Sequence, residues 1–472
     1  MILAKKQRRA VTEAMQLTCF KAYDIRAKLG EELNEEIAYR IGRSVAQVLQ
    51  TTHVVIGYDA RETSPTLANA VARGVHRAGA NVLDIGLSGT EEMYWAVTSQ
   101  KACAGIEVTA SHNPIDYNGM KIVKRGSEPL SDEEFQAIRI CAEGEAFTDP
   151  IERGARENIE ASARQAYVEQ IMQFVSPSAL KPLKIVVNAG NGAAGPTFDA
   201  LAAALEGKGV QAEFIRVHHA PDSSFPNGIP NPLLPENHAK TADVVREQGA
   251  DFGVAFDGDF DRCFLFDEEG AFVPGEYVIG LLAAAYLAKE PGAKIVHDPR
   301  VIWNTIDTVK AAGGTPLVSK TGHAFIKQSM RGAHALYGGE MSAHHYFRDF
   351  AYCDSGMIPW LLIWELISTS GKSLGHLLQD CRARFPSSGE MNFTVANAAA
   401  CLQSAEAQYG PDALTVDHLD GVSIAYEAWR FNLRKSNTEP LVRLNMETRG
   451  DAELLAQKTA ELTQFIEAHA AG

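Results

Sequence analysis

Asp257, Asp259 and Asp261 alternate along a short polar stretch between two apolar runs, FGVAF and CFLF, which are typical of β-strands. Three carboxylates this close repel one another unless a cation lies between them. A tight loop can turn alternate side chains toward one point, which suits a hard ion such as Mg2+ that prefers oxygen ligands and keeps other positions for water or phosphate. The stretch therefore predicts a metal site that faces a phosphate group.

Other interpretations of this loop account for fewer of its residues. A polar hairpin tip would explain Asp and Gly, which are common in turns, but not the alternation. A calcium-binding EF-hand would match the three carboxylates, with Glu268 as its last ligand, but it needs Gly where Arg262 stands and helices on both sides. A phosphatase of the haloacid dehalogenase type would use the first two aspartates and leave Asp261 and Arg262 without a role.

Ser111 lies in the segment TASHNP, residues 109–114, after the strand-like run GIEV. A serine hydroxyl is a weak nucleophile alone, but near a divalent cation and a basic group it can accept and return a phosphoryl group. Lys121, in NGMK, would supply a positive charge nearby. The segment lacks the Gly-x-Ser-x-Gly elbow of hydrolases. The plain alternatives are a loop cap for Ser111 and an exposed lysine for Lys121.

Three further stretches carry polar side chains that suit a sugar phosphate. In the first, LTCFKAYDIRAKLG, we expect a short strand that runs into a loop with Tyr23 and Arg26. The second comprises SKTGHAFIK, with His323, and GGEMSAHHYF, where acidic, hydroxyl and imidazole groups can bind vicinal hydroxyls of a sugar. The third, RKSNTEP, offers a guanidinium, hydroxyls and an amide as a cradle for a phosphate that does not react. The candidates in the last two are Glu340, Ser342, His344, Arg434, Ser436, Asn437 and Thr438. Structural networks, solvated charges and a helix cap are the alternatives.

The composition excludes several classes of protein. A net charge of -15 and a pI near 5.4 argue against a nucleic-acid partner, because such binding needs Lys and Arg to neutralise phosphates. The seven cysteines are scattered and form no CxxC pair, which indicates buried thiols in a reducing cytoplasm rather than a zinc site or disulfides. No apolar run approaches the roughly 18 residues of a membrane helix, so we expect no membrane partner. The basic first sixteen residues lack a secretory core and are expected to be a flexible extension, with Met15 as a possible natural start.

Strand, helix and strand alternate three times along the chain. The units begin at HVVIGYD, LKIVVNAGNGAAG and AKIVHDPR, and each continues with a helical run and a second strand. We therefore predict an α/β fold with three similar units of parallel or mixed sheets, followed by a smaller α+β domain. Such alternation also occurs in α/β proteins without a repeat.

Domain boundaries are expected where the composition loosens. We place one after the charged stretch 144–158, which precedes a helix that includes Ala166 to Val175, and one at PSSG near residue 385. The Pro-rich stretch 221–236 is predicted to be a loop inside the second domain. The expected parts are a flexible basic extension (1–16), the α/β domain with the Ser111 loop (17–160), the α/β domain with the aspartate loop (161–271), the α/β domain with the sugar loop (272–384) and the α+β domain with the phosphate loop (385–472).

Taken together, TASHNP, DGDFDR, GEMSAH and RKSNTEP resemble, in this order and spacing, the four active-site loops of the α-D-phosphohexomutase family. The match covers nearly the whole chain after Leu17, and CFKAYDIR and GEMSAHHYFRDFAYCDSGM are most similar to bacterial members that act on mannose phosphates. The resemblance implies four domains around a central cleft, with a last domain that can rotate. Two positions depart from the pattern. Ala27 replaces a Gly, and Arg300 stands where some relatives carry a substrate-contacting Lys.

The resemblance also implies a role for each loop. Ser111 would be a phosphoserine, one of whose oxygens binds a single Mg2+ together with the three aspartates, and Arg262 would contact the phosphoryl region. Glu340 and Ser342 would bind sugar hydroxyls, and RKSNTEP would hold the distal phosphate. The cleft would be lined by Tyr23, Arg26, Lys121, His323 and His344. The proton of the hydroxyl could be moved by Lys121, His323 or Arg26, of which His323 is favoured.

The implied activity is the reversible conversion of mannose 6-phosphate to mannose 1-phosphate through a phosphoserine and mannose 1,6-bisphosphate. Hexose 1,6-bisphosphate would prime the enzyme, and the product would supply GDP-mannose for polysaccharides. A glucose-phosphate or dual-specificity mutase is the main alternative. A glucosamine-phosphate mutase is disfavoured by Met341, where its sugar loop usually carries Gln. A non-catalytic sugar-phosphate-binding protein would need an inactive Ser111 or a broken aspartate loop, and phosphatase activity would need water to intercept the phosphoserine.

Overall fold

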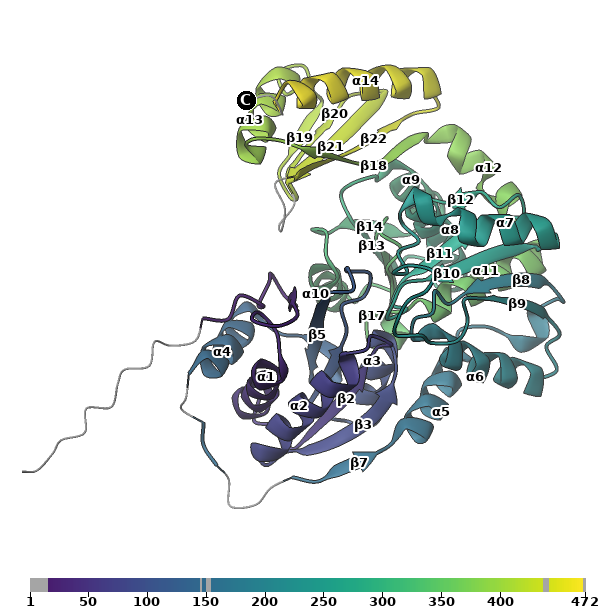
Figure 1. Ribbon diagram of the computed structural model, residues 1–472. Helices are drawn as coiled ribbons and strands as arrows, with labels where there is room; N and C mark the ends of the chain where they lie inside the picture. Colours follow the sequence, from purple (N-terminus) through teal and green to yellow (C-terminus); the bar gives the residue numbers. More distant parts are fainter. Residues whose placement is uncertain (1–15, 145–146, 150–153, 436–440, 470–472) are drawn as a thin grey trace, which may run out of the picture.

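The computed structural model describes residues 16–144, 147–149, 154–435 and 441–469. Its strands form four sheets, which follow one another along the chain. Figure 1 shows the first three parts packed beside one another and the C-terminal part, in yellow, seated above the third. The predicted α/β fold with four domains is confirmed by this arrangement.

The first sheet has the strand order β1-β5-β4-β2-β3-β7, with β6 paired to β5. Its elements are β1 (Ile25–Lys28), α1 (Glu35–Val48), β2 (His53–Tyr58), α2 (Ser64–Arg77), β3 (Asn81–Leu87), α3 (Thr90–Ser99), β4 (Ala104–Val108), β5 (Tyr117–Lys124), β6 (Glu128–Pro129), α4 (Asp132–Glu143) and β7 (Arg156–Asn158). Helix α1 begins where the Asn34 side chain accepts a hydrogen bond from the Ile37 amide, which caps the helix. Helix α4 begins at a capping box of Ser131 and Glu134.

The second sheet has the order β12-β11-β10-β8-β9. Its elements are α5 (Glu160–Ile171), β8 (Lys184–Asn188), α6 (Ala194–Gly207), β9 (Glu213–Val217), α7 (Ala239–Gln248), β10 (Phe252–Phe256), β11 (Cys263–Phe266) and β12 (Phe272–Val273). Helix α5 packs against α3 of the first part and α6 of the second, so it joins the two parts. The Pro-rich stretch 221–236 forms a loop as predicted, ending in a short 3-10 turn.

The third sheet has the order β14-β13-β15-β16-β17. Its elements are α8 (Gly275–Lys289), β13 (Lys294–His297), α9 (Trp303–Ala311), β14 (Thr315–Val318), α10 (His323–Ala333), β15 (Tyr337–Gly339), β16 (His345–Phe347), β17 (Cys353–Asp354), α11 (Met357–Ser370) and α12 (Leu374–Arg384). Helix α11 is apolar over most of its length, and its Trp360 and Trp364 are fully buried against Phe214 of the second part. This helix therefore fastens the third part to the second.

The fourth sheet is antiparallel throughout, in the order β18-β22-β21-β20-β19. Its elements are β18 (Ser387–Thr394), α13 (Ala398–Tyr409), β19 (Thr415–Asp417), β20 (Val422–Ala425), β21 (Trp429–Lys435), β22 (Leu441–Thr448) and α14 (Ala452–Ala468). Both helices pack on the sheet and enclose a hydrophobic cluster of their own. The largest hydrophobic cluster, by contrast, runs through the first three parts.

The first three sheets share one topology, which confirms the predicted repeat. Each has a central strand with a parallel neighbour on both sides, namely β2 between β3 and β4, β8 between β9 and β10, and β13 between β14 and β15. In each, the later parallel neighbour is followed by an antiparallel strand, which is β5, β11 or β16. The loops that lead into these antiparallel strands therefore occupy equivalent positions in the three sheets.

Two local predictions are wrong. The loop with Tyr23 precedes strand β1 rather than following it, and Arg26 lies in the strand, which pairs with β5. Helix α5 ends at Ile171 rather than Val175, and the backbone amide of its C-cap residue, Met172, donates a hydrogen bond to the carbonyl oxygen of Val168. By contrast, the stretch PSSG does lie between the helical region and the last segment as predicted, because α12 ends at Arg384 and β18 begins at Ser387, with a bulge before Glu390 that accommodates Gly389 at a φ of 67°.

The structure tests only part of two expectations, one about the N-terminal extension and one about membranes. Most of the predicted N-terminal extension, residues 1–15, lies outside the described residues. Among the helices that the structure describes, none is long and apolar enough to cross a membrane.

Candidate active site

Three of the predicted loops occupy the same place in the three repeated sheets. The Ser111 loop joins β4 to β5, the aspartate loop joins β10 to β11, and the loop with Glu340 joins β15 to β16. In each case the chain leaves a parallel strand and returns antiparallel beside it. Because ligands in α/β folds bind outside the carboxyl ends of parallel strands, all three loops stand where a ligand is expected.

Ser111 contacts the aspartate loop directly. Its buried Oγ donates a hydrogen bond of 2.6 Å to Asp257 Oδ2. Arg262 places its Nε 3.3 Å from the same carboxylate oxygen and donates a hydrogen bond of 2.9 Å to His112 Nδ1. Burial and the nearby Arg262 lower the pKa of His112 well below its ordinary value, so the ring is neutral. The serine therefore lies beside a carboxylate and a guanidinium, the groups expected around a phosphoryl-transfer serine.

The three aspartates form one buried cluster. Each offers a carboxylate oxygen within 4.8 Å of the others. Burial and the neighbouring Asp259 raise the pKa of Asp257 to about 7, which expresses the repulsion inside the cluster. Among the described residues, the Oδ1 atoms of Asp257, Asp259 and Asp261 have no hydrogen-bond partner. Buried oxygens without donors fit a hard divalent cation, so the donor set is suitable for a metal ion.

Lys121 and Thr90 complete the surroundings of the aspartates. Lys121 Nζ lies 2.8 Å from Asp259 Oδ2 and also forms an ion pair with Asp261. Although burial acts against its charge, Asp259 and Asp261 raise the pKa of Lys121 above its ordinary value, so the ammonium group is charged. Thr90 Oγ1, at the start of α3, donates a hydrogen bond of 2.6 Å to Asp259 Oδ2. These contacts hold Asp259 and Asp261 between the first two sheets.

The backbone of the Ser111 loop is held by Arg61, which the sequence analysis did not single out. Ser111 adopts a φ of 48°, a left-handed conformation that is uncommon for serine. The buried Arg61 guanidinium donates hydrogen bonds to the carbonyl oxygens of Ser111 at 2.9 Å, Asn113 at 2.5 Å and Pro114 at 2.9 Å. Asp59, in turn, lies 3.5 Å from Arg61 Nε. One planar guanidinium therefore fixes the course of the loop.

The predicted sugar-binding residues lie together after β15. Ser342 Oγ is 3.2 Å from His344 Nδ1, and Glu340 Oε2 is 3.5 Å from the same nitrogen. Glu340 Oε1 accepts a hydrogen bond of 2.8 Å from the Gly322 amide. The other ring nitrogen, His344 Nε2, lies 3.6 Å from Asp261 Oδ1. The sugar loop therefore borders the aspartate cluster.

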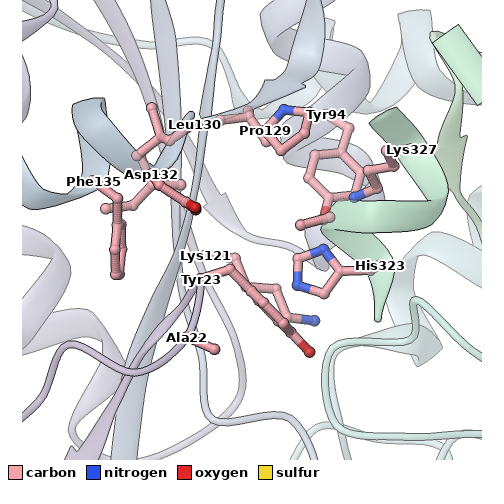
Figure 2. A pocket seen from close by; sticks show the side chains of 13 residues that line it. Ala22, Tyr23, Tyr94, Lys121, Pro129, Leu130, Asp132, Phe135, His323 and Lys327 are labelled. Carbon is pink, nitrogen blue, oxygen red and sulfur yellow. The ribbon is translucent and has the colours of Figure 1, made fainter. Parts of the chain in front are cut away.

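His323, Tyr23 and Lys121 line one pocket, in which Figure 2 shows their side chains close together. The rings of Tyr23 and His323 meet edge to face, with centroids 4.7 Å apart. His323 Nε2 is 3.3 Å from Asp24 Oδ2, and Arg26 Nη2 is 3.9 Å from the same oxygen. Although burial acts to raise it, His323 and Arg26 lower the pKa of Asp24 to about 2. A charged Asp24 therefore orients both side chains at the pocket.

The predicted phosphate cradle is described only in part. Arg434, in β21, donates a hydrogen bond of 2.8 Å to Glu390 Oε2. Arg300 Nη1 is 3.3 Å from the same oxygen, and its Nη2 is 3.5 Å from Ser342 Oγ. Arg434 thus reaches the sugar loop through Glu390 and Arg300. The other predicted members of the cradle, Ser436, Asn437 and Thr438, lie outside the described residues.

The structure brings most of the predicted residues together from distant parts of the sequence. Ser111, Lys121 and Arg262 contact the aspartates directly, and His344 borders Asp261. Arg434 lies apart, on the fourth sheet. The sequence analysis missed Arg61, Thr90 and Glu390. A signal existed for Arg61, because the polar segment DAR directly follows the strand HVVIGY, whereas Thr90 and Glu390 lie in no recognisable motif.

Comparisons with known proteins agree with this geometry. Four models described as phosphoglucomutase/phosphomannomutase domains match the chain in order: alpha/beta/alpha domain I over residues 17–149, domain II over 165–270, domain III over 274–385 and the C-terminal domain over 390–464. The chain belongs to the phosphoglucomutase/phosphomannomutase family of phosphohexomutases. The resemblance inferred from the four motifs is confirmed.

Individual relatives make the comparison more specific. A protein named phosphomannomutase from Salmonella montevideo is 56% identical over 95% of this chain and 99% of its own length. A Xanthomonas campestris protein named phosphohexose mutases is 54% identical over 96% of this chain and 100% of its own. The crystal structure of a phosphoglucomutase/phosphomannomutase family protein from Burkholderia thailandensis superposes with a TM-score of 0.84 at 30% identity, covering 96% of this chain and 98% of the other.

Proposed function

We propose that the protein is a phosphomannomutase, which interconverts mannose 6-phosphate and mannose 1-phosphate. The observation that carries the proposal is the 2.6 Å contact of Ser111 Oγ with Asp257 Oδ2, beside the guanidinium of Arg262. A serine in this position can carry a phosphoryl group, because cationic groups and a metal ion would stabilise the transferring charge. Relatives that are 56% identical and named phosphomannomutase support mannose phosphates as the substrates.

Asp257, Asp259 and Asp261 would hold one Mg2+ together with an oxygen of the phosphorylated Ser111. The Oδ1 atoms of the three aspartates accept no hydrogen bond within the described part of the chain, which supports this assignment. When bound, the ion would neutralise the carboxylates and stabilise negative charge on the transferring phosphoryl group. Lys121 and Arg262 act as fixed positive charges of the chain beside the same carboxylates.

In the first half of the reaction, phosphorylated Ser111 gives its phosphoryl group to the free hydroxyl of mannose 6-phosphate. The bond between phosphorus and Ser111 Oγ breaks, a bond to the sugar oxygen forms, and the hydroxyl proton passes to a base. We favour His323 as that base, because Asp24 holds its Nε2 and its buried Nδ1 has no partner among the described residues. Lys121 and Arg26 are the alternatives. The product of this half is mannose 1,6-bisphosphate.

In the second half, the bisphosphate turns end for end and returns its other phosphoryl group to Ser111 Oγ, while the sugar oxygen regains a proton. Glu340 and Ser342 would bind sugar hydroxyls in both orientations, with His344 and Tyr23 beside them. Arg434, with Ser436, Asn437 and Thr438, would hold the phosphate that does not react. A hexose 1,6-bisphosphate would prime protein that lacks the phosphoryl group on Ser111.

The proposed product would supply GDP-mannose for polysaccharide synthesis. The partners would be small sugar phosphates. We place the protein in the cytoplasm, because its seven cysteines, all in the part that the structure describes, are free thiols, as expected in a reducing compartment.

A dual-specificity mutase is the second candidate. Glucose and mannose differ only at C2, and the relative named phosphohexose mutases favours a broader substrate range. Met341 is almost buried and its backbone amide is bonded to Asp298, so the backbone of the sugar loop is fixed by groups outside the substrate. Discrimination at C2 would then depend on the side chains of Glu340 and Ser342.

Initial rates with mannose 1-phosphate and glucose 1-phosphate, measured side by side, test this proposal. Both assays would contain Mg2+ and a trace of hexose 1,6-bisphosphate. Because the two sugars share every reacting group, the comparison isolates recognition at C2. A clear preference for mannose would support a phosphomannomutase, and equal rates would support the dual mutase. No rate with either sugar would contradict both.

A further inference from the structure

One face of helix α10 carries three basic side chains that each contact the first part of the molecule. His323, Lys327 and Arg331 follow one another at intervals of four residues, which places them on the same side of the helix. His323 Nε2 lies 3.3 Å from Asp24 Oδ2, in the segment before β1. Lys327 packs on Tyr94 of α3, and Arg331 bonds the turn between β5 and β6. We propose that Lys327, at the centre of this face, is a positioning residue that fixes α10 and its His323 against the part that carries the reacting serine. This inference rests on the proposed function.

Lys327 is buried and has two close partners. Its Nζ lies 2.6 Å from Asp354 Oδ1, in β17 of the third part, and 3.9 Å from the centre of the Tyr94 ring. Figure 2 shows His323 and Lys327 on the same helix, with Tyr94 beside Lys327. An aromatic face attracts an ammonium group, and the attraction is stronger where water is excluded. Because Tyr94 is buried as well, this contact joins α10 to α3 across the boundary between the third and first parts.

Asp354 extends the contact to the sugar loop. It is fully buried, and its Oδ2 lies 4.0 Å from His344 Nε2. Apart from the ion pair with Lys327, neither of its carboxylate oxygens accepts a hydrogen bond from the described residues. Lys327 is therefore the closest group that offsets the charge of Asp354, and it holds this carboxylate beside His344 while it holds α10 against α3.

The two ends of the same helix face are also fixed. Arg331 Nη2 donates hydrogen bonds of 3.2 Å and 3.1 Å to the carbonyl oxygens of Gly126 and Ser127, in the turn between β5 and β6. At the start of α10, the Gly322 amide donates its hydrogen bond to Glu340 of the sugar loop. The buried ion pair lies between these two anchors, so it controls the depth at which the middle of the helix rests.

Stability alone gives no reason for a lysine at this position. A buried ion pair can often be replaced by apolar side chains of similar size without loss of stability. The proposed reaction, however, uses a base and a serine from different parts of the molecule, and a misplacement of about 1 Å can lower a rate about a hundredfold. An ion pair between two defined atoms fixes a helix more sharply than apolar packing does. Lys327 therefore serves the placement of His323 rather than the stability of the fold.

The test removes the ion pair in two steps. Lys327→Met keeps an unbranched side chain over Tyr94 but removes the ammonium group, and a double variant with Asp354→Asn also removes the unpaired carboxylate. The matched control is Lys184→Met with Glu213→Gln, at a partly exposed pair 3.4 Å apart. This pair lies at the start of β8 and β9, the opposite edge of the second sheet from the aspartate loop. Thermal unfolding gives the Tm, and steady-state rates with mannose 1-phosphate give kcat and KM.

We expect Lys327→Met to lower the Tm, because Asp354 stays buried without its partner, and the double variant to regain most of this loss. In both variants kcat should fall at least about tenfold while KM changes less than about threefold, because the base is misplaced and substrate contacts are retained. The control should match wild type. A double variant that regains both Tm and kcat would overturn the proposal. If the double variant does not fold, Arg331→Met decides, since a lower kcat at similar KM supports the role of this helix face and wild-type kinetics overturn it.

NMR spectra of protein with isotope-labelled histidine rings test the placement of His323 without turnover. The resonance of His323 is identified by its loss in His323→Gln. It should shift in the Lys327→Met, Asp354→Asn double variant and stay in place in the control. An unmoved His323 resonance would overturn the inference, even if the wild type proves inactive on sugar phosphates. Such inactivity with a shifted resonance would contradict the proposed function and support the placement of His323 by Lys327.

Discussion

At the scale of single residues, the charges around Ser111 are balanced only as a group. Asp257, Asp259 and Asp261 are buried with Lys121 and contact the half-buried Arg262, so three carboxyl groups face two positive charges. A buried carboxylate is costly unless it is paired, which is why each of these side chains depends on the others. A bound cation and a phosphoryl group would therefore change the charge balance among these side chains.

Replacing Lys121 with Met removes the ammonium group that pairs Asp259 and Asp261. Without divalent cations, we expect the variant to lose about 3 kcal/mol of stability, because breaking a buried ion pair leaves its partners uncompensated. Mg2+ should then raise the apparent Tm of the variant more than that of the wild type. Thermal unfolding in EDTA and in Mg2+ measures both effects. An equal response of the two proteins to Mg2+ would contradict this view of the cluster.

At the scale of elements, the site is built by repeating one connection three times. The loops after β4, β10 and β15 supply the serine, the aspartates and the sugar-binding residues, respectively. Each loop is then fixed by side chains from elsewhere. Arg61 and Thr90 hold the first two loops, and Glu340 bonds the start of α10 through Gly322.

The lysine variant of Arg61 tests whether the guanidinium fork positions Ser111. Lys keeps the charge beside Asp59 but cannot donate to several carbonyl oxygens at fixed angles. We expect Arg61→Lys to lower kcat at least about tenfold while KM changes less, because small displacements of a reacting group reduce the rate more than binding. Steady-state kinetics measure this. Arg73→Lys, at an exposed pair with Glu35, is the control, and an equal effect of both substitutions would refute the assignment.

Much of the order of helices, strands and loops could be predicted from the sequence. Apolar periodicity and turn residues act locally, so the three α/β units and the positions of Ser111 and the aspartates were predicted correctly. Arg61, Thr90 and Glu390 were not predicted. Thr90 is 169 residues from Asp259 and Arg61 is 50 residues from Ser111, and such pairs are brought together only by the packing of whole sheets. For the same reason, the sequence predicts a loop at Arg26, whereas Arg26 lies in β1, which pairs with β5.

At the scale of the whole molecule, buried charges join the fourth sheet to the third. Arg430 donates hydrogen bonds to the carbonyl oxygens of Pro299 and Arg300, and Glu447 accepts them from the amides of Ile302 and Trp303 at the start of α9. The fourth part has a hydrophobic cluster of its own. The joint is therefore made of polar contacts, which a domain movement can exchange more readily than a continuous apolar core.

Glu276, at the start of α8 near this joint, gives the joint a dependence on pH. Burial raises its pKa from 4.5 to about 7, so the folded protein prefers the neutral carboxyl group. The stability it contributes is complete below its unfolded pKa and is lost as pH rises through about 7. Glu276→Gln, neutral throughout, should match wild type near pH 4.5 and exceed it at about pH 8 by on the order of 3 kcal/mol. Unfolding measured across this range checks the sign, and a constant difference between the proteins would contradict it.

The central claim is that Ser111 carries the phosphoryl group, and peptide mass spectrometry tests it most directly. Dephosphorylated protein would be incubated with hexose 1,6-bisphosphate and Mg2+, digested and analysed. The account predicts one added phosphoryl group, on the peptide that contains TASHNP, and none in Ser111→Ala, which should also lose turnover. A phosphoryl group on another residue, or full turnover by Ser111→Ala, would contradict the account.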